Sequence, residues 1–180
     1  MNKKFAAPLA AVVIACFLPA AAYSSGKEFL TPAEIEKIQK SQTIDARITA
    51  YTDAAMLRLS SVEERLSGIE SEYGDPFEFF SNEDMLDGYF RILTSIMHNL
   101  EAAFENPRQE PARVRRALNT LRDAAQKAEK ELAELKRRAE RDSNEALIVY
   151  LNRATDITRG AHEGAEEGLS RLRGTSSSPP

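Results

Sequence analysis

The feature that most constrains this fold is an unbroken heptad row of apolar residues between residues 111 and 141. The row advances in alternating steps of four and three: Val114, Leu118, Leu121, Ala125, Ala128, Leu132, Leu135 and Ala139. Such steps place side chains on one face of an α-helix, and repeated heptads are typical of helices packed along their length. The row predicts a long amphipathic helix that buries one face.

Two earlier segments carry apolar rows with the same helical period. No Gly or Pro interrupts residues 33–67, which predicts one continuous first helix that begins at a capping box on Thr31. A second helix is expected between a cap at Ser81 and the Asn106-Pro107 pair, because the residue before a proline is driven out of helical geometry. Both helices should bury one apolar face.

A last apolar row runs from Leu147 to Leu172, and a capping box of Asp142 and Glu145 predicts its start. No Gly or Pro lies between residues 112 and 159, so the alternative is one continuous helix over 111–172. We expect the break, because long helices without caps are the exception. The predicted fold is all-α: an antiparallel bundle of four long amphipathic helices, or of three very long ones.

Residues 1–22 have the composition of a bacterial secretory signal peptide. Lys3 and Lys4 precede an apolar run too short for a mature membrane anchor, and small residues follow at positions 20–22. The alternative is a membrane-anchored lipoprotein acylated at Cys16. This cysteine is the last residue of a segment that loosely matches the lipobox, the motif at which bacterial lipoproteins are acylated. We therefore expect an exported protein, periplasmic or secreted.

The rest of the chain divides into three predicted parts. These are a flexible lead at 23–30, a single helical-bundle domain at 31–173, and a disordered Ser/Pro tail at 174–180. Removal of the leader takes away the only cysteine, so a thiol active site is excluded. It also leaves 22 basic against 28 acidic residues, a net charge of −6, which disfavours nucleic acid as a partner.

Acidic and aromatic residues concentrate in the stretch 70–90, which has no basic residue. Three of its acids lie near the start of the second helix, where a negative charge interacts favourably with the helix dipole. The other four, Glu70, Glu72, Asp75 and Glu78, are expected to face the segment 108–141, with eleven bases and six acids, in this chain or in a partner. The sequence leaves two roles open for the aromatic side chains of Phe77, Phe79 and Phe80. They form either a plug that seals one end of the bundle or an exposed partner-binding patch.

Three glycines, Gly160, Gly164 and Gly168, recur at intervals of four on the last helix. Each glycine costs a helix roughly 1 kcal/mol relative to alanine. Three on one face suggest a neighbour packed too close for a side chain. That neighbour is either another helix of the bundle or a partner in a docking groove.

No arrangement of residues in the sequence is typical of a catalytic or cofactor site. The Glu-x-x-His spacing of di-iron bundles fails at both histidines, and no nucleophile or phosphate-loop motif occurs. His162 and Glu166 share a helical face and are weak candidates for metal binding. We expect no enzyme activity and no cofactor.

The predicted function is a non-enzymatic interaction or scaffold module of the cell envelope. Its partner would be another protein, or a second copy of the chain, bound through helical packing. One alternative is a small-ligand or metal carrier that uses the bundle interior, and another is a periplasmic chaperone-like protein. No mature segment is apolar and long enough to cross a membrane.

Overall fold

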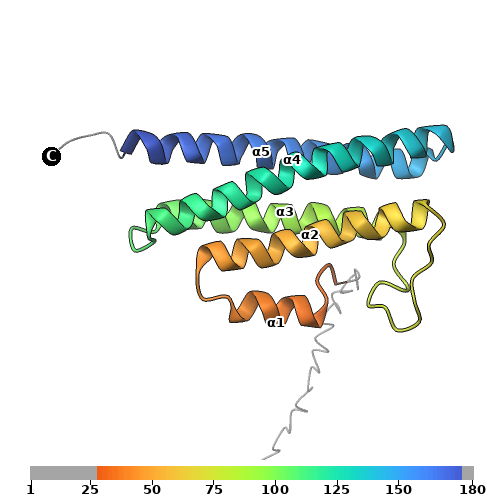
Figure 1. The fold of residues 1–180 in the computed structure, drawn as a ribbon, viewed down its shortest axis with the longest axis horizontal. Coiled ribbons are helices and arrows are strands. Elements are labelled where there is room, and N and C mark those ends of the chain that lie inside the picture. Colours follow the sequence, from red (N-terminus) through yellow and green to blue (C-terminus); the bar gives the residue numbers. More distant parts are fainter. Residues whose placement is uncertain (1–27, 176–180) are drawn as a thin grey trace, which may run out of the picture.

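The computed structural model describes residues 28–175, and this part of the chain contains five α-helices and no strand. They are α1 (Pro32–Lys40), α2 (Ile44–Leu66), α3 (Asn82–Glu105), α4 (Pro111–Arg141) and α5 (Glu145–Thr175). The four long helices form a bundle in which consecutive helices run antiparallel (Figure 1). The predicted fold class is confirmed, and the break at 142–144 removes the alternative of one helix over 111–172.

The predicted signal peptide at 1–22, with Cys16, lies outside the described residues. So do residues 23–27 of the predicted lead and 176–180 of the predicted tail. None of the described helices combines the length and the apolar character that a bilayer span requires.

The long helices are arranged so that α2 and α5 each pack between α3 and α4. Helices α2 and α4 run in the same direction, since Asp45 and Arg116 pair near their starts, with Oδ2 and Nε 2.8 Å apart. Helices α3 and α5 are also parallel, because Arg153 Nη1 lies 3.0 Å from Asp87 Oδ1 near their starts. The short connection at 106–110 therefore crosses the bundle diagonally from α3 to α4.

The core lies along the axis between the four long helices. All eight residues of the heptad row in α4 are buried, as the sequence predicts. The largest side chains that are almost wholly buried come from all four helices: Ile48, Leu59, Met85, Leu86, Tyr89, Ile92, Ile96, Leu118, Leu121, Leu132, Leu135 and Leu147. Burial of such a side chain contributes roughly 1.5–3 kcal/mol, so these rows supply most of the driving force for folding.

The prediction of one continuous first helix is wrong. The chain leaves helical geometry at residues 41–43, and the side chain of Thr43 caps α2 by accepting from the N–H of Ala46 at 3.4 Å. The turn lets α1 fold back along α2, where Ile38 is buried (Figure 1). A step of six residues in the apolar row, from Ile38 to Ile44, is the sequence signal of this break.

The predicted caps are confirmed at Thr31 and Ser81, where capping boxes form with Glu34 and Asp84. The predicted box of Asp142 and Glu145 is wrong. Ser143 has a φ of 53°, and this left-handed residue turns the chain so that Asn144 precedes α5. The Oδ1 of Asn144 then accepts from the N–H of Leu147 at 3.1 Å and caps the helix.

Candidate functional site

The loop 67–81 between α2 and α3 closes one end of the bundle and is anchored from inside by Arg65. The Arg65 guanidinium donates to the carbonyl of Phe77 at 2.5 Å, to the carbonyl of Phe80 and to Ser71 Oγ at 2.9 Å. Gly68 and Gly74 have φ values of 81° and 88°, which the loop needs for its turns. The positive charge of Arg65, near the end of α2, is therefore directed into the loop.

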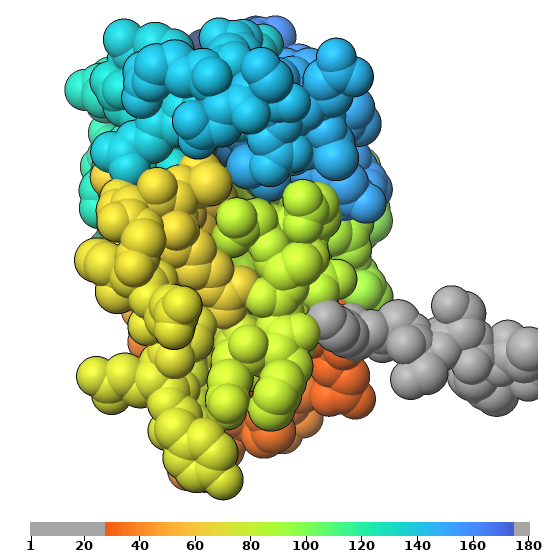
Figure 2. Space-filling model, turned by 90° about the vertical axis from the view of Figure 1, so that its right-hand side faces the viewer, coloured from red at the N-terminus to blue at the C-terminus, as the bar shows by residue number. Residues whose placement is uncertain are grey.

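The outer side of this loop presents apolar side chains to solvent. Leu57 is 49% exposed, Ile69 57% and Tyr73 97%. They line a hollow of about 820 Å³ between the start of α1, the end of α2 and the loop. Figure 2 shows this end of the molecule, where the loop, in yellow to yellow-green, projects beyond the helices. We call this surface the acidic end face: Leu57, Glu64, Ile69, Glu70, Glu72 and Tyr73.

The sequence predicts that four acids of the loop 67–81 face the basic helix α4, and the described residues show no ion pair between them and that helix. Among residues 28–175, no ion pair joins Glu70, Glu72, Asp75 or Glu78 to α4. Asp75 and Glu78 instead accept from loop N–H groups, those of Phe77 at 2.7 Å and Gly74 at 3.1 Å. The expected contact within the chain is thus absent from the described residues, and the exposed carboxylates of Glu70 and Glu72 remain on the surface.

The three phenylalanines of the loop divide between the two predicted roles. Phe77 is buried, with its ring centroid 4.8 Å from the Arg58 guanidinium and 5.8 Å from the ring of Phe80, edge to face. Phe80 is partly buried, whereas Phe79 is 81% exposed. Phe77 therefore acts as the plug of the bundle end, and Phe79 is placed where a partner can reach it.

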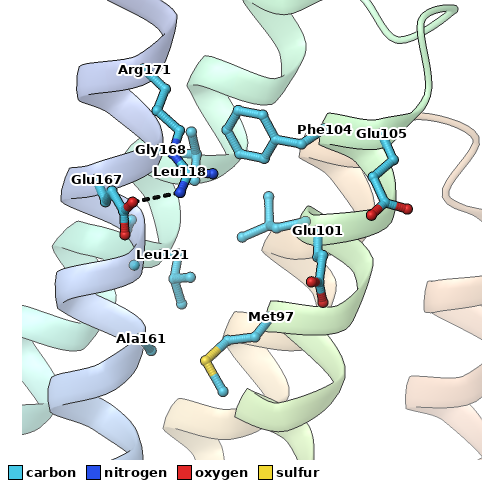
Figure 3. A pocket seen from close by; sticks show the side chains of 13 residues that line it. Met97, Glu101, Phe104, Glu105, Leu118, Leu121, Ala161, Glu167, Gly168 and Arg171 are labelled. Atoms are coloured by element: carbon cyan, nitrogen blue, oxygen red, sulfur yellow. Dashed lines mark hydrogen bonds and ion pairs between the residues drawn. The ribbon is translucent and has the colours of Figure 1, made fainter.

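A second hollow, of about 340 Å³, lies between α3, α4 and α5 near the opposite end of the bundle (Figure 3). We call it the α3/α5 groove. Its apolar lining comes from all three helices: Met97, Leu100, Phe104, Leu118, Leu121, Ala161, Gly164, Ala165 and Gly168. Glu101, Glu105, Glu167 and Arg171 complete its lining. The groove is thus apolar at its base and mainly acidic around it.

The three predicted glycines have different surroundings. A Cβ at Gly168 would lie 3.0 Å from Leu118 and 3.1 Å from Phe104, so the expected close packing occurs there. A Cβ at Gly160 or Gly164 would meet nothing within 4 Å. The expectation of a close neighbour within the chain is wrong at these two positions. Of the three, Gly164 and Gly168 line the α3/α5 groove.

The weak metal candidates on α5 lie beside charged partners from α4. His162 Nδ1 is 3.3 Å from Glu129 Oε1, and a Glu166 oxygen is 3.8 Å from Arg122 Nε. Within residues 28–175, no group of three or more His, Cys, Asp and Glu side chains is placed to hold a metal ion. His98 is exposed on α3.

Two buried polar contacts are not predicted by the apolar rows and motifs of the sequence. The Arg58 side chain is 3% exposed and binds both carboxylate oxygens of Glu34, at 2.7 Å for the Nη2–Oε2 pair. Burial alone would raise the pKa of Glu34, but hydrogen bonds from Arg58 and Thr31 hold that pKa below its usual value. Tyr89 Oη lies 2.7 Å from Thr158 Oγ1 in the core, and burial raises the pKa of the Tyr89 phenol.

A sequence signal for the first of these contacts does exist. Ala50, Ala54 and Arg58 form a second row on α2, at steps of four, and all three are buried. A helix that buries two faces must pack against other parts of the chain on two sides. Here α1 packs against the second face of α2, and the carbonyl oxygen of Phe29 lies 2.7 Å from Arg58 Nη2.

No protein-family model matches this chain, and neither a curated protein nor a solved structure is significantly similar to it. Its function is therefore inferred from the residues and geometry described above.

Proposed function

We propose that the chain is a non-enzymatic interaction module of the cell envelope, and that its acidic end face binds a basic protein segment with apolar side chains. The observation that carries this proposal is the exposure of Leu57, Ile69 and Tyr73 around one hollow. Exposed apolar side chains gathered at a hollow and rimmed by polar residues are typical of protein interaction sites.

Charge determines what kind of partner fits this face. Glu64, Glu70 and Glu72 are exposed around the apolar side chains, while Arg65 is engaged inside the loop. A negative rim attracts a positively charged partner and repels an acidic one. Apolar burial then contributes about 25 cal/mol per Å² of area removed from water.

Two model peptides of opposite charge test this proposal, one of alternating Lys and Leu and one of alternating Glu and Leu. We expect the Lys/Leu peptide to bind the mature protein in calorimetric titrations, more weakly as salt rises, and the Glu/Leu peptide not to bind. Replacing Ile69 and Tyr73 together by Ser should lower the affinity at least about tenfold, a loss of about 1.4 kcal/mol. Both side chains are exposed, so the fold should tolerate the change.

Val149→Ser is the matched control, because Val149 is 66% exposed on α5 and lies outside the hollow. It should leave the affinity unchanged. Equal binding of both peptides, or equal effects of both sets of substitutions, would contradict the proposal. Sedimentation of the protein alone shows whether the partner is a second copy. A chaperone-like role is one form of the proposal, with an unfolded basic protein as the partner.

We further propose that the protein is exported, and the leader-like composition of residues 1–22 supports this. The mass and the N-terminal residue of protein isolated from its native cell test it. Cleavage by a simple signal peptidase would leave Tyr23 as the first residue. An acylated Cys16 would indicate the lipoprotein alternative, and an intact Met1 or Asn2 would contradict export.

The second candidate function, a carrier of a small ligand, is favoured by one observation. The α3/α5 groove offers an apolar volume of about 340 Å³ among three helices of the bundle. Pockets for small ligands have volumes of roughly 300–1,000 Å³, so the groove lies at the lower end of that range.

A further inference from the structure

The α3/α5 groove is closed at one end and open along its side. At Gly168, α5 approaches Leu118 and Phe104 so closely that a Cβ would lie 3.0–3.1 Å from both side chains. One helical turn earlier, a Cβ at Gly164 would meet nothing within 4 Å. The space between the helices therefore widens along α5 from Gly168 to Gly164, and the base of the groove is made by buried leucines of α3 and α4.

The size of the groove sets the shape of its occupant. An α-helix with side chains is about 10–12 Å across, which a volume of about 340 Å³ cannot contain over more than a fraction of a turn. A single extended hydrocarbon chain needs no such width. Met97 and Phe104 point toward the space between α3 and α5 in Figure 3, and both offer apolar surface to such a chain.

The charged residues around the groove determine which sign of charge the headgroup of a ligand should carry. Glu167 pairs with Arg171 across one helical turn of α5, at 2.5 Å, so these two charges offset each other. Glu101 and Glu105, on consecutive turns of α3, form no ion pair within residues 28–175. The groove thus carries a net charge of about −2, which favours a cation and disfavours an anion.

The aromatic ring of Phe104 also favours a positive charge. Phe104 is 36% exposed, and in Figure 3 its ring extends from α3 toward Gly168 and Leu118 at the upper end of the groove. Aromatic faces attract ammonium groups, and quaternary ammonium ions in particular are recognised in this way. A headgroup near Phe104 would therefore meet both a ring and the carboxylates of Glu101 and Glu105.

We propose that the α3/α5 groove binds a cationic amphiphile, with one hydrocarbon chain between α3 and α5 and an amine or quaternary ammonium headgroup beside Glu101 and Glu105. This proposal rests on the carrier function, to which it assigns a ligand class. The groove is separate from the acidic end face, so the proposal for the groove and the proposal for the end face stand or fall independently.

Two detergents with the same chain and opposite charge test the ligand class. Dodecyltrimethylammonium bromide and sodium dodecyl sulfate are titrated into the mature protein below their micelle-forming concentrations and followed by calorimetry. We expect one saturable site for the ammonium compound and at least about tenfold weaker binding of the sulfate. Glu101→Gln together with Glu105→Gln should reduce this discrimination at least about threefold.

A pair of glycine substitutions tests the location of the site. Gly164→Leu adds a side chain at a position that lines the groove and has open space, and it should abolish binding. Gly160→Leu is the matched control, because it also points into open space on α5 but does not line the groove. Both changes replace Gly by a better helix former, so both variants should stay folded, as circular dichroism will show.

Three results would overturn the proposal. The first is the absence of a saturable site for the ammonium compound in the wild-type protein. The second is equal affinity for the two detergents, which would indicate general apolar adsorption. The third is equal binding by Gly164→Leu and Gly160→Leu when both variants are folded, which would place the ligand elsewhere.

Discussion

Arg58 shows how one charged residue can be kept inside a helical bundle. Its guanidinium lies between α2 and α3, donates to Glu34, to Phe29 O and to Ala54 O, and lies near the Phe77 ring. Gly88 on α3 leaves room for it, since a Cβ there would be 3.5 Å from Arg58 Nε. A buried charge of this kind is tolerated because both terminal nitrogens of the guanidinium donate two hydrogen bonds each, including two to the carboxylate of Glu34.

Glu34→Gln should make the stability of the protein less dependent on pH. At pH near 7 the variant should be less stable by about 2 kcal/mol, because Arg58 loses its charged partner in a buried site. The pKa of Glu34 is lower in the folded protein than the unfolded value of about 4.3. Ionised Glu34 therefore stabilises the fold fully above that value, and the contribution is lost as pH falls toward the folded pKa.

Urea unfolding of wild type and variant, near neutral pH and in acid, measures this effect. The difference in unfolding free energy should shrink as the solution is acidified. Glu36→Gln is the control: Glu36 pairs with Lys40 on the exposed side of α1 and should change stability little at either pH. A constant difference between Glu34→Gln and wild type would contradict the assignment.

Thr158→Val should destabilise the protein by about 1–3 kcal/mol, because it leaves the buried hydroxyl of Tyr89 without its partner. Tyr89→Phe in the same chain should recover part of this loss, since no unpaired phenol then remains in the core. Thermal unfolding of both single variants and the double variant gives the coupling energy. A coupling near zero would show that the contact adds nothing to stability.

At the scale of elements, α1 differs from the other helices. It has nine residues and packs against α2. Isolated helices of this length are marginal in water, so α1 depends on its contacts with the bundle. Those contacts are the burial of Ile38, the Glu34–Arg58 pair and an exposed ion pair of Lys37 with Asp53 at 2.7 Å.

Ile38→Ala should therefore loosen α1 without opening the bundle. We expect amide hydrogens of residues 32–40 to exchange at least about tenfold faster, while those of α3 to α5 keep their protection. Gln39→Ala, at an exposed neighbouring position, should have no such effect. Equal acceleration in all helices would show that α1 unfolds only together with the bundle.

At the scale of the molecule, the four long helices share one continuous core. The buried cluster contains residues of α2, α3, α4 and α5, together with Phe77 from the connecting loop. No long helix buries its apolar face against only one neighbour, because α2 and α5 each pack beside both α3 and α4. The bundle should thus unfold as a unit.

Leu135→Ala should lower the stability of the whole bundle by about 3 kcal/mol, since it removes a buried side chain and leaves a cavity. Leu57→Ala, which changes a half-exposed leucine, should cost less than about 1 kcal/mol. Urea unfolding followed by both circular dichroism and tyrosine fluorescence should give coincident single transitions. Separate transitions would contradict a shared core.

The sequence by itself determined the class of fold, the four long helices and most of the core. Repeats of three and four residues have one physical solution, a helix with a buried face, and all eight residues of the row in α4 are buried. Capping chemistry is also local, so the starts at Thr31 and Ser81 could be predicted. The break after Lys40 was missed because a polar run with no Gly or Pro is compatible with continued helix.

The tertiary structure alone decided which surfaces are available. Glycine spacing is the same at Gly160, Gly164 and Gly168, but only Gly168 meets a close neighbour. Phe77 and Phe79 differ in burial although they are two residues apart in one loop. Such differences depend on where α3, α4 and the loop approach each other, which is a long-range property that periodicity within one helix does not encode. The acidic end face and the α3/α5 groove both arise at this level.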